Sequence, residues 1–502
     1  LVKRYNVTGT YFQRRINDAY INLDSNNESK IYELLTFIKP DVVIYCSAIS
    51  DPDTCERDKE KCKIINKESV INLTRALKSF KNTRLIFIST DYVFDGTNDD
   101  GYDENSTPNP INYYGKTKSE AEEFVNAHHN SIVIRIPIIY GFNDENDKET
   151  FITKVIRSSK QYNKDSTEIK FDNTQLRYPV LADDIARVIN NLVQKNITGI
   201  IHLTSREGVT KFQWSEKIND VFSLGSKLEP SDESKNSFAP RPKNVKLNTP
   251  KTSKLIGPLD LHELPKGLEI VRQQMRCVFR MIYSVKPYQN EFGSNFGKFR
   301  INLGEIMAKE SPCQEADLVL GIPESGLFPA TGYAHAMNLP FHHGIVTDFV
   351  TPKTLMYNIY RRLENINKKL IIIESIVKNK NVVLIDEAII SGSTMKIIVQ
   401  KLIQIGVKSV HVRVASPVMI NNCAYGILDE DAFLLSKNLN TGSKNVSLIE
   451  KNMMESFGVD SIKFISLDGF LNQLNELYSR WRKGPPDMNG NDFFCTDCWR
   501  EK

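Results

Sequence analysis

Short runs of apolar residues alternate along the chain with longer stretches in which apolar residues recur every three or four positions. The runs at residues 41–48, 84–90 and 131–137 are bounded by polar residues, as is typical of buried strands. Residues 56–80 have helical spacing and lie between the first two runs. Strands and helices that alternate in this way predict βαβ units around a parallel sheet.

A second series of the same kind occupies the C-terminal half of the chain. Apolar runs at residues 316–323, 381–388 and 409–417 predict three further strands. Residues 393–405 predict the helix between the last two of these strands. The polar stretch at residues 230–250, which contains several prolines, predicts an irregular loop late in the first series.

We therefore expect two α/β domains, residues 1–270 and residues 271–502. The 502 residues suit two or three domains of about 150 residues each. The 65 Lys and Arg against 61 Asp and Glu give a net charge of +4, which is no argument for a nucleic-acid partner. No apolar run reaches the roughly 18 residues of a membrane helix. The chain begins with Leu1, so we expect a fragment that lacks its N-terminal segment.

Thr90, Tyr114 and Lys118 form the first group of residues with candidate chemistry. Tyr114 and Lys118 are four residues apart at the start of a helical stretch, so they share one face. A lysine cation near a phenol lowers the pKa of the phenol, and such a tyrosine exchanges protons with a carbonyl or an alcohol. Thr90 ends the neighbouring strand and can share the hydrogen bond to the same oxygen. A Tyr and a Lys at this spacing are also a common surface pair.

The segment STDYVFDG at residues 89–96 favours a catalytic group over a surface pair. Together with YYGKTK at residues 113–118 it resembles the extended short-chain dehydrogenase/reductase family, in its dTDP-4-dehydrorhamnose reductase branch. The regulatory beta subunit of methionine adenosyltransferase is similar as well. The resemblance runs from about residue 5 to residue 275. Further matching segments are residues 41–66, 102–104, 140–141, 177–180, 183–184, 202–213 and 241–244.

This resemblance implies a Rossmann-type doubly wound sheet, NAD(P) binding and reduction of a nucleotide-linked 4-keto sugar. It gives the catalytic proton chemistry to Thr90, Tyr114 and Lys118. The residues that it places in the cofactor site are Ser47, Ala48, Asn66, Tyr114 and Lys118.

The sequence departs from that family at its start. The glycine-rich turn that should follow the first strand is absent, and the chain enters at the second strand, residues 5–11. As given, we therefore expect it to lack the pyrophosphate cradle. Arg14 and Arg15 follow the second strand, where an arginine can meet a 2′-phosphate, and this favours NADP over NAD. A solvated charge pair is the alternative for these two arginines.

A second group of candidate residues follows the strand expected at residues 381–388. Asp386 and Glu387 end this strand, and the segment SGST at residues 391–394 opens a helix. Backbone N–H groups at a helix N-terminus bind phosphate, and nearby hydroxyls add donors. Two acids before such a turn can hold ribose hydroxyls and a hard cation such as Mg²⁺. An ordinary strand, turn and capped helix is the alternative.

This stretch resembles the motif that binds phosphoribosyl pyrophosphate (PRPP) in phosphoribosyltransferases. Residues 275–498 as a whole resemble the phosphoribosyltransferase domain of amidophosphoribosyltransferase, which implies a type I phosphoribosyltransferase-like α/β domain. The implied reaction displaces pyrophosphate from C1 of PRPP by ammonia, in purine synthesis. The implied PRPP-binding residues are Glu324, Ser325, Gly326, Lys353, Arg362, Asp386, Glu387, Ser391, Gly392, Ser393 and Thr394. The implied ligands of Mg²⁺ are Ser325, Asp386 and Glu387.

Three residues depart from this second family. Glu387 stands where the family has Asp, and Ser391 stands where it usually has Arg. Lys353 replaces an Arg and cannot make the same bidentate phosphate contact. The glutaminase domain of the family, which begins with a nucleophilic Cys, has no counterpart in the sequence. Ammonia would therefore come from solution or from a partner protein.

The eight cysteines are too few for a disulfide framework, which favours a reducing compartment. The C-x-x-C at residues 495–498 is by itself half a zinc site or a redox pair. Some amidophosphoribosyltransferases hold a structural [4Fe–4S] cluster, which needs four thiolates. The residues at the matching positions are Cys277, Cys423, Cys495 and Cys498. Zinc or no metal is the alternative. The cysteines that match nothing are Cys46, Cys55, Cys62 and Cys313.

These observations predict a bifunctional fusion of an NADP-dependent reductase-like domain with an amidophosphoribosyltransferase-like domain. The alternative is that one or both halves are non-catalytic modules that sense NADP or PRPP, as the methionine adenosyltransferase beta subunit serves regulation. We expect a cytoplasmic homo-oligomer whose ligands are a nucleotide-sugar substrate and PRPP. We expect no nucleic-acid partner and no membrane partner.

Overall fold

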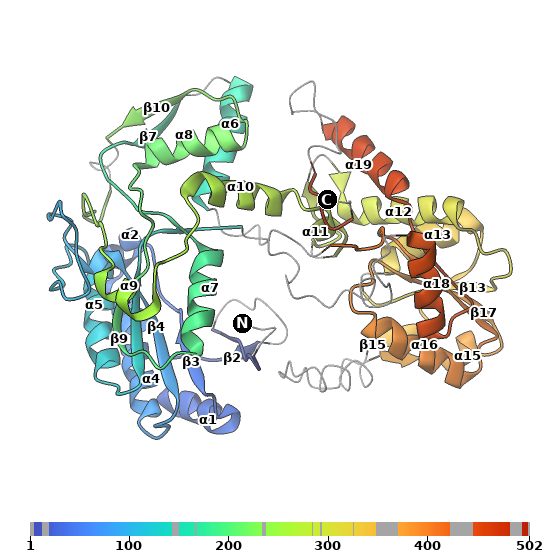
Figure 1. The fold of residues 1–502 in the computed structure, drawn as a ribbon, viewed down its shortest axis with the longest axis horizontal. Coiled ribbons are helices and arrows are strands. Elements are labelled where there is room, and N and C mark those ends of the chain that lie inside the picture. Colours follow the sequence, from blue (N-terminus) through green and yellow to red (C-terminus); the bar gives the residue numbers. More distant parts are fainter. Residues whose placement is uncertain are drawn as a thin grey trace. The chain divides into compact units, whose positions relative to one another are not determined.

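The computed structural model consists of two compact units, the N-terminal unit over Thr8–Arg272 and the C-terminal unit over Gln273–Lys502 (Figure 1). Each unit is an α/β fold around a parallel sheet. The residues that the structure describes are 5–12, 20–142, 150–165, 168–232, 237–283, 285–291, 294–324, 326–347, 370–421, 445–481 and 494–499.

A four-stranded parallel sheet forms the centre of the N-terminal unit. Its order is β3 (Val42–Tyr45), β4 (Arg84–Thr90), β5 (Ser131–Ile136) and β9 (Gly199–His202). The first three strands lie where the apolar runs predicted them. β3 is shorter than expected because its pairing with β4 ends at Tyr45, so the residues after it leave the sheet as a loop.

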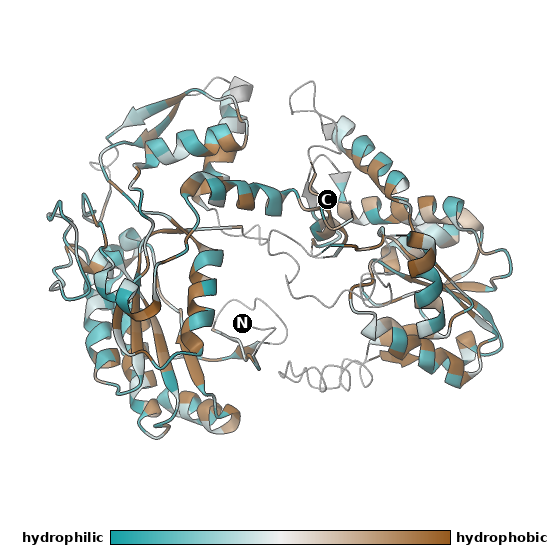
Figure 2. Ribbon diagram, in the orientation of Figure 1, coloured by the Kyte–Doolittle hydropathy of each residue, from teal (hydrophilic) through white to brown (hydrophobic). Residues whose placement is uncertain are grey.

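Helices cover both faces of this sheet, because successive strand residues point to opposite sides. One face packs against α1 (Glu28–Ile38), α4 (Ser69–Leu77) and α5 (Tyr113–Asn126) in a single apolar core. The other face packs against α7 (Ala182–Val193) in a second core. The strands between these helices are among the most hydrophobic segments of the unit (Figure 2).

The helix expected over residues 56–80 is wrong as one continuous element. The structure has α2 (Pro52–Arg57), α3 (Lys59–Lys63), a π-helical turn (Ile64–Glu68) and then α4. The break falls at Asp58, whose φ of −128° and ψ of 75° are not helical. The carboxylate of Asp58 caps α3 by accepting a backbone N–H at 3.0 Å, which is the bond that makes Asp a helix-starting residue.

Further elements complete the N-terminal unit. The loop expected over residues 230–250 begins later than predicted, because β10 (Leu228–Ser231) pairs in parallel with β7 (Ile169–Asp172). The other elements are β1 (Thr10–Tyr11), β2 (Ile21–Asn22), β6 (Ile139–Tyr140), α6 (Phe151–Asp165), β8 (Val180–Leu181), α8 (Lys211–Val221), α9 (Pro250–Ile256) and α10 (Leu264–Met275).

A five-stranded parallel sheet forms the centre of the C-terminal unit. Its order is β14 (Phe341–His342), β13 (Leu318–Gly321), β17 (Asn381–Asp386), β18 (Ser409–Val414) and β19 (Ser461–Phe464). Three of these strands were predicted from apolar runs. The predicted starts of β17 and β18 are exact, and the other predicted ends extend two or three residues too far. This sheet confirms the expectation of a second parallel α/β fold.

Helices again lie on both faces of the sheet. α12 (Phe296–Glu310), α13 (Leu327–Met337) and α19 (Leu467–Trp481) pack on one face. α16 (Ser393–Ile405) and α18 (Val446–Phe457) pack on the other. α16 begins and ends where the sequence predicted.

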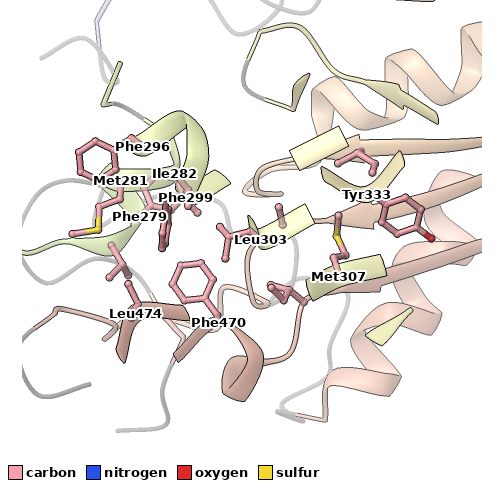
Figure 3. Close-up of a cluster of buried hydrophobic side chains, with 14 of the residues drawn as sticks. Phe279, Met281, Ile282, Phe296, Phe299, Leu303, Met307, Tyr333, Phe470 and Leu474 are labelled. Carbon is pink, nitrogen blue, oxygen red and sulfur yellow. The ribbon is translucent and has the colours of Figure 1, made fainter. Parts of the chain in front are cut away.

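The first of these cores is rich in aromatic side chains (Figure 3). Phe299 of α12 and Phe470 of α19 meet edge to face, with ring centroids 6.1 Å apart. No helix in the described part of the chain combines the length and the apolar character needed to cross a bilayer. The remaining elements of this unit are α11 (Val278–Tyr283), β11 (Asn290–Glu291), β12 (Ser294–Asn295), β15 (Ile345–Thr347), β16 (Leu370–Ile372) and α15 (Glu374–Val377).

Candidate functional sites

Polar residues of the N-terminal unit gather at the carboxyl ends of β3 and β4. In open parallel sheets, ligands bind at the carboxyl ends of the strands. Thr90 is the last residue of β4 and is buried. Its Oγ1 accepts the backbone N–H of Tyr92 at 3.2 Å and so caps a turn of 3-10 helix, Asp91–Val93. The side chain of Thr90 is therefore fixed at the edge of the sheet.

Gly115 allows the start of α5 to approach this turn. A Cβ at residue 115 would overlap the carbonyl oxygen of Tyr92, so only glycine fits. Asn112 caps the helix, since its Oδ1 accepts the N–H of Gly115 at 2.8 Å. The approach places Tyr114 against Tyr92, with ring centroids 6.1 Å apart, and in hydrogen-bond contact with Thr90. The structure thus brings together two residues that were predicted to share a site.

The pKa of Tyr114 differs from the expectation. Burial raises it well above its usual value, and the hydrogen bond with Thr90 opposes this rise only in part. We expected the cation of Lys118 to lower this pKa. That expectation is wrong, because burial is the largest influence on the phenol and Lys118 is bonded elsewhere. Tyr114 is therefore a protonated phenol at neutral pH, which suits a proton donor.

Lys118 lies one turn further along α5, with only 3% of its surface exposed. Its Nζ donates to the carbonyl oxygen of Ile88 at 2.7 Å and lies 3.9 Å from the centre of the Phe87 ring. Burial lowers the pKa of Lys118 to about 8, although the charge of Glu122 favours the cation. Lys118 therefore titrates close to neutral pH, as catalytic groups often do.

Asp91 belongs to this group and was missed in the sequence. Its Oδ1 accepts the hydroxyl of Thr90 at 3.1 Å, and its Oδ2 has no hydrogen-bond partner among the described residues. Burial raises the pKa of Asp91 to about 7, against the charge of Arg177, which lowers it. The available signal was its position directly after Thr90 in STDYVFDG. Its burial was not visible in that segment.

The predicted cofactor-lining residues surround the loop after β3. Ser47 is exposed in this loop, and Ala48 is half-buried. Asn66 is buried behind it and bonds both backbone groups of Ile49: Oδ1 accepts its N–H at 2.7 Å, and Nδ2 donates to its carbonyl at 3.0 Å. Asn66 thus positions the loop. An exposed, fixed loop beside the half-buried Tyr114 and the buried Lys118 fits a dinucleotide at this end of the sheet.

In the C-terminal unit, the carboxyl ends of β13 and β17 meet, since Gly321 pairs with Ile385. Gly326 lies in the loop after β13, and a Cβ there would overlap the carbonyl oxygen of Ile385. The loop therefore passes directly over the end of β17, with Glu324 exposed in it. This contact brings the loop of Glu324 and Gly326, which was expected to bind PRPP, next to the end of β17.

Asp386 and Glu387 are both buried, with 8% and 4% of their surfaces exposed. Burial, together with the charge of Glu387, raises the pKa of Asp386 well above its usual value. Oε2 of Glu387 has no hydrogen-bond partner among the described residues. Arg300, which the sequence analysis missed, is buried nearby, and burial lowers its pKa although the charge of Glu387 favours the cation. Two buried acids with an unsatisfied oxygen fit a hard divalent cation such as Mg²⁺.

The turn after these acids opens α16 without a side-chain cap. Gly392 has a φ of 72°, a left-handed conformation that favours glycine. The hydroxyls of Ser391 and Ser393 lie 3.2 Å apart, and Thr394 is half-buried beside them. Backbone N–H groups at the start of α16 and these hydroxyls together form a donor set that suits a phosphate.

Three of the four predicted cluster ligands come from segments that meet. Cys277 and Cys495 pair in an isolated parallel bridge. The carbonyl oxygen of Cys498 accepts the N–H groups of Ile420 at 2.9 Å and Asn421 at 3.1 Å. All three cysteines are buried. Buried cysteines on backbone segments that meet fit a thiolate-bound metal, either an iron–sulfur cluster or zinc.

Some predicted site residues lie outside the described part of the chain, so their roles stay predictions. Two were expected at the cofactor 2′-phosphate, three at PRPP and one at the cluster. These residues are Arg14, Arg15, Ser325, Lys353, Arg362 and Cys423.

Known proteins resemble both halves of the chain. Methionine adenosyltransferase 2 subunit beta of Danio rerio is 32% identical over 241 residues, 46% of this chain and 72% of that protein. Amidophosphoribosyltransferase of Synechococcus elongatus is 31% identical over 228 residues, 45% of this chain and 42% of that protein. A solved dTDP-4-dehydrorhamnose reductase of Bacillus anthracis, in complex with NADP, is 28% identical with a TM-score of 0.46, covering 50% of this chain and 85% of that one.

The two similarities divide the chain between them. The similarity to amidophosphoribosyltransferase covers the part that follows the reductase-like half, and the chain spans less than half of that relative's length. A family model described as the RmlD substrate binding domain matches residues 3–274, which is more than half of the chain. The chain therefore belongs to the RmlD substrate binding domain family.

Proposed function

We propose that the N-terminal unit is an NADP-dependent reductase of a nucleotide-linked 4-keto sugar. The observation that carries this proposal is the contact between Thr90 and Tyr114 beside buried Lys118, at the carboxyl ends of two parallel strands. NADPH, when bound, supplies the hydride. Tyr114 donates its phenolic proton to the sugar carbonyl oxygen as that oxygen gains negative charge.

The neighbouring residues have supporting roles in this proposal. Thr90 orients the phenol through their hydrogen bond. Lys118, whose pKa of about 8 lies close to neutral pH, takes part in the proton chemistry of the site. Asn66 positions the loop that carries Ser47 and Ala48 against the cofactor. The residues assigned to the 2′-phosphate that distinguishes NADP from NAD are Arg14 and Arg15.

Oxidation of NADPH in the presence of dTDP-4-dehydrorhamnose tests the reductase. The full chain is expected to consume NADPH, and Tyr114→Phe should lower the turnover number by about 10²–10⁴-fold, since it removes the donated proton. Tyr113→Phe is the matched control, because it removes the adjacent hydroxyl and leaves Tyr114 in place. Turnover that survives Tyr114→Phe would contradict the assignment.

A regulatory role is the second candidate for this unit. It is supported by the similarity to methionine adenosyltransferase 2 subunit beta, whose name describes a subunit of another enzyme. In this case NADP would bind and no keto sugar would be reduced. Calorimetric binding of NADP without turnover, and with affinity unchanged in Tyr114→Phe, would favour the regulatory role.

We propose that the C-terminal unit binds PRPP with Mg²⁺ and transfers an amino group to C1 with release of pyrophosphate. The observation that carries this is the contact of the Gly326 loop with the end of β17, next to Asp386 and Glu387. The two acids are proposed to hold the cation and the ribose hydroxyls, and the start of α16 the 5′-phosphate. Ammonia enters from solution or from a partner protein.

Release of pyrophosphate from PRPP, Mg²⁺ and ammonium tests this second activity. The full chain is expected to release pyrophosphate, and Asp386→Asn should abolish the release by removing a carboxylate from the cation site. Glu374→Gln is a control, since this acid is exposed and forms a surface ion pair. Binding of PRPP without release of pyrophosphate would instead identify a PRPP sensor.

We propose that Cys277, Cys423, Cys495 and Cys498 bind a [4Fe–4S] cluster. The adjacency of the first and third of these residues supports the proposal. Anaerobically purified protein should be coloured and contain four irons per chain, and Cys498→Ser should lose both the colour and the iron. Cys46→Ser is the matched control. A colourless, iron-free protein would contradict the cluster.

We also propose that these activities reside in separate domains, residues 1–270 and 271–502, of a cytoplasmic homo-oligomer. The apolar cores of the two halves support the division, because each half has its own. Light scattering of the purified chain tests the oligomeric state, and a mass equal to one chain would contradict it.

A further inference from the structure

Three metal-binding side chains lie together on the C-terminal unit, outside both sites proposed above. Cys313 and Glu315 belong to the loop between α12 and β13, and His411 is the third residue of β18. These residues lie toward the N-terminal ends of the parallel strands. Asp386 is the last residue of β17 and lies at the opposite, C-terminal end of the strands. The cluster is therefore separate from the proposed PRPP site.

The donor atoms of these residues converge. One atom from each, a thiol sulfur, a carboxylate oxygen and an imidazole nitrogen, lies within 4.8 Å of the others. Nε2 of His411 is 3.6 Å from Oε1 of Glu315, and the thiol of Cys313 is hydrogen-bonded to the same carboxylate. Cys313 and His411 are buried, whereas the side chain of Glu315 is 61% exposed. The cluster thus has buried donors and one side open to solvent.

Hydrogen bonds fix the orientation of the His411 imidazole in this cluster. Nδ1 is hydrogen-bonded to Oγ of Ser461 at 2.9 Å, and Nη1 of Arg413 donates to the same oxygen at 3.0 Å. Metal-binding histidines are usually held by such a bond on the ring nitrogen that does not bind the metal. Nε2 lies 3.0 Å from Oγ of Ser409, which offers an oxygen on the metal side of the ring.

We propose that Cys313, Glu315 and His411 bind a zinc ion, with the Ser409 hydroxyl or a water as the fourth ligand. Zinc accepts this mixture of sulfur, nitrogen and oxygen in a four-coordinate site, whereas Mg²⁺ and Ca²⁺ require oxygen ligands. The bound ion would fasten the loop before β13 to the centre of the sheet. Its role is structural, because the site lies away from the proposed chemistry.

Charges near the cluster act in both directions. Arg413 disfavours a cation by simple repulsion, but Glu315 and the Cys313 thiolate together supply two negative charges against it. Burial and, less strongly, the charge of Arg413 lower the pKa of His411, which favours the neutral form that binds metal. The charge of Arg413 also opposes the rise that burial causes in the pKa of the Cys313 thiol. Burial still raises the pKa of Cys313 to about 11, so zinc must displace the thiol proton on binding.

Titration of the full chain with zinc chloride tests the proposal. The chain is first stripped with a chelator, in a Cys495→Ser, Cys498→Ser background that removes metal uptake by the other cysteines. One zinc per chain is expected. Free zinc at 100 times its dissociation constant should raise the melting temperature of the C-terminal unit by about 5–10 °C. No zinc uptake by this background would overturn the proposal.

Single substitutions then identify the ligands. Glu315→Ala changes an exposed side chain, so the fold is expected to persist while zinc affinity falls at least tenfold. Glu374→Ala, at another exposed acid of the same unit, should leave the affinity unchanged. Cobalt provides a second readout, since a thiolate ligand gives a charge-transfer band that Cys313→Ser should abolish. Uptake and spectrum unchanged in both Glu315→Ala and Cys313→Ser would also overturn the proposal.

Discussion

Burial shifts the pKa values of two ionisable side chains around Tyr114 toward neutrality. The pKa of Lys118 falls to about 8 and that of Asp91 rises to about 7. Burial disfavours the charged form of both groups. Each therefore destabilises the fold at pH values where the same side chain is charged in the unfolded chain. Perturbed pKa values of this kind cluster at functional sites, where catalysis needs groups that titrate near the working pH.

Asp91→Asn is expected to stabilise the protein in a pH-dependent way. In the folded chain Asp91 keeps its proton up to about pH 7, whereas an unfolded chain loses it near its usual value of 3.8. The destabilisation therefore grows from about pH 4 to 7 and is complete above 7. The amide, which never ionises, should add on the order of 2–4 kcal/mol at pH 8 and almost nothing at pH 4. Urea unfolding at both pH values measures the difference.

Asp95→Asn is the matched control, with the opposite sign. A hydrogen bond from Tyr102 lowers the pKa of Asp95 to about 2, so its stabilising effect is present above 3.8 and is lost as the pH falls through 2. The variant should lose stability equally at pH 5 and pH 8. If Asp91→Asn has the same effect at pH 4 and pH 8, Asp91 does not carry the shifted pKa.

Motifs predicted which residues of the first site come together, but not their ionisation. Thr90, Tyr114 and Lys118 were identified from local segments, and the structure brings Thr90 and Tyr114 into contact. The pKa of Tyr114 was misjudged because burial by distant parts of the chain outweighs a neighbouring cation. Asp91 was passed over for the same reason, since its surroundings include Arg177 from a remote segment.

At the scale of elements, the sequence predicted the ends of a helix correctly where the residues at those ends themselves terminate the helix. α16 was predicted at both ends, and its flanking residues Gly392 and Gly406 both have positive φ. Residues 56–80 were misread because apolar spacing continues across a capping Asp58 and across the π-helical turn. The amide of Asn66 in that turn bonds the loop after β3, a contact that no local pattern reveals.

Gly326→Ala tests how the loop after β13 is held against β17. The added Cβ would overlap the carbonyl oxygen of Ile385, so the loop must move away from Asp386. We expect a loss of about 1–3 kcal/mol in the unfolding free energy of the C-terminal unit, as for other overpacked positions. PRPP binding should weaken as well, and calorimetry measures both effects.

Thr331→Ala is the matched substitution, on the helix α13 that follows this loop. Thr331 is exposed on α13, and its hydroxyl bonds only the helix's own backbone, at Leu327. Stability and PRPP affinity should both stay near those of the parent. Equal behaviour of the two variants would show that the loop tolerates a side chain at residue 326.

At the scale of the whole molecule, each unit has its own apolar cores and its own parallel sheet. We expect two unfolding transitions on heating, because cooperativity seldom extends across independent cores. NADP should raise one transition and PRPP with Mg²⁺ the other, each through binding to one folded unit. Differential scanning calorimetry of the full chain measures both. A single transition that responds to both ligands would contradict this independence.

The division into two α/β folds was visible in the sequence because strand-like runs recur on both sides of residue 270. The group of Cys313 and His411 was not visible, because nearly one hundred residues separate its members. Only the sheet brings β18 beside the loop that precedes β13. Sites assembled across a sheet therefore lie beyond local patterns unless a family motif marks each part.

The buried acids at the end of β17 have a consequence for the medium around the protein. Asp386 keeps its proton to a higher pH than an ordinary aspartate. If Asp386 holds magnesium as proposed, the cation binds the ionised carboxylate, so magnesium uptake should release protons from the carboxyl groups that still carry one. The C-terminal unit would then exchange protons for magnesium, and alkaline pH would favour its loading. The pH and the concentration of free magnesium would together set how much of the unit carries the cation.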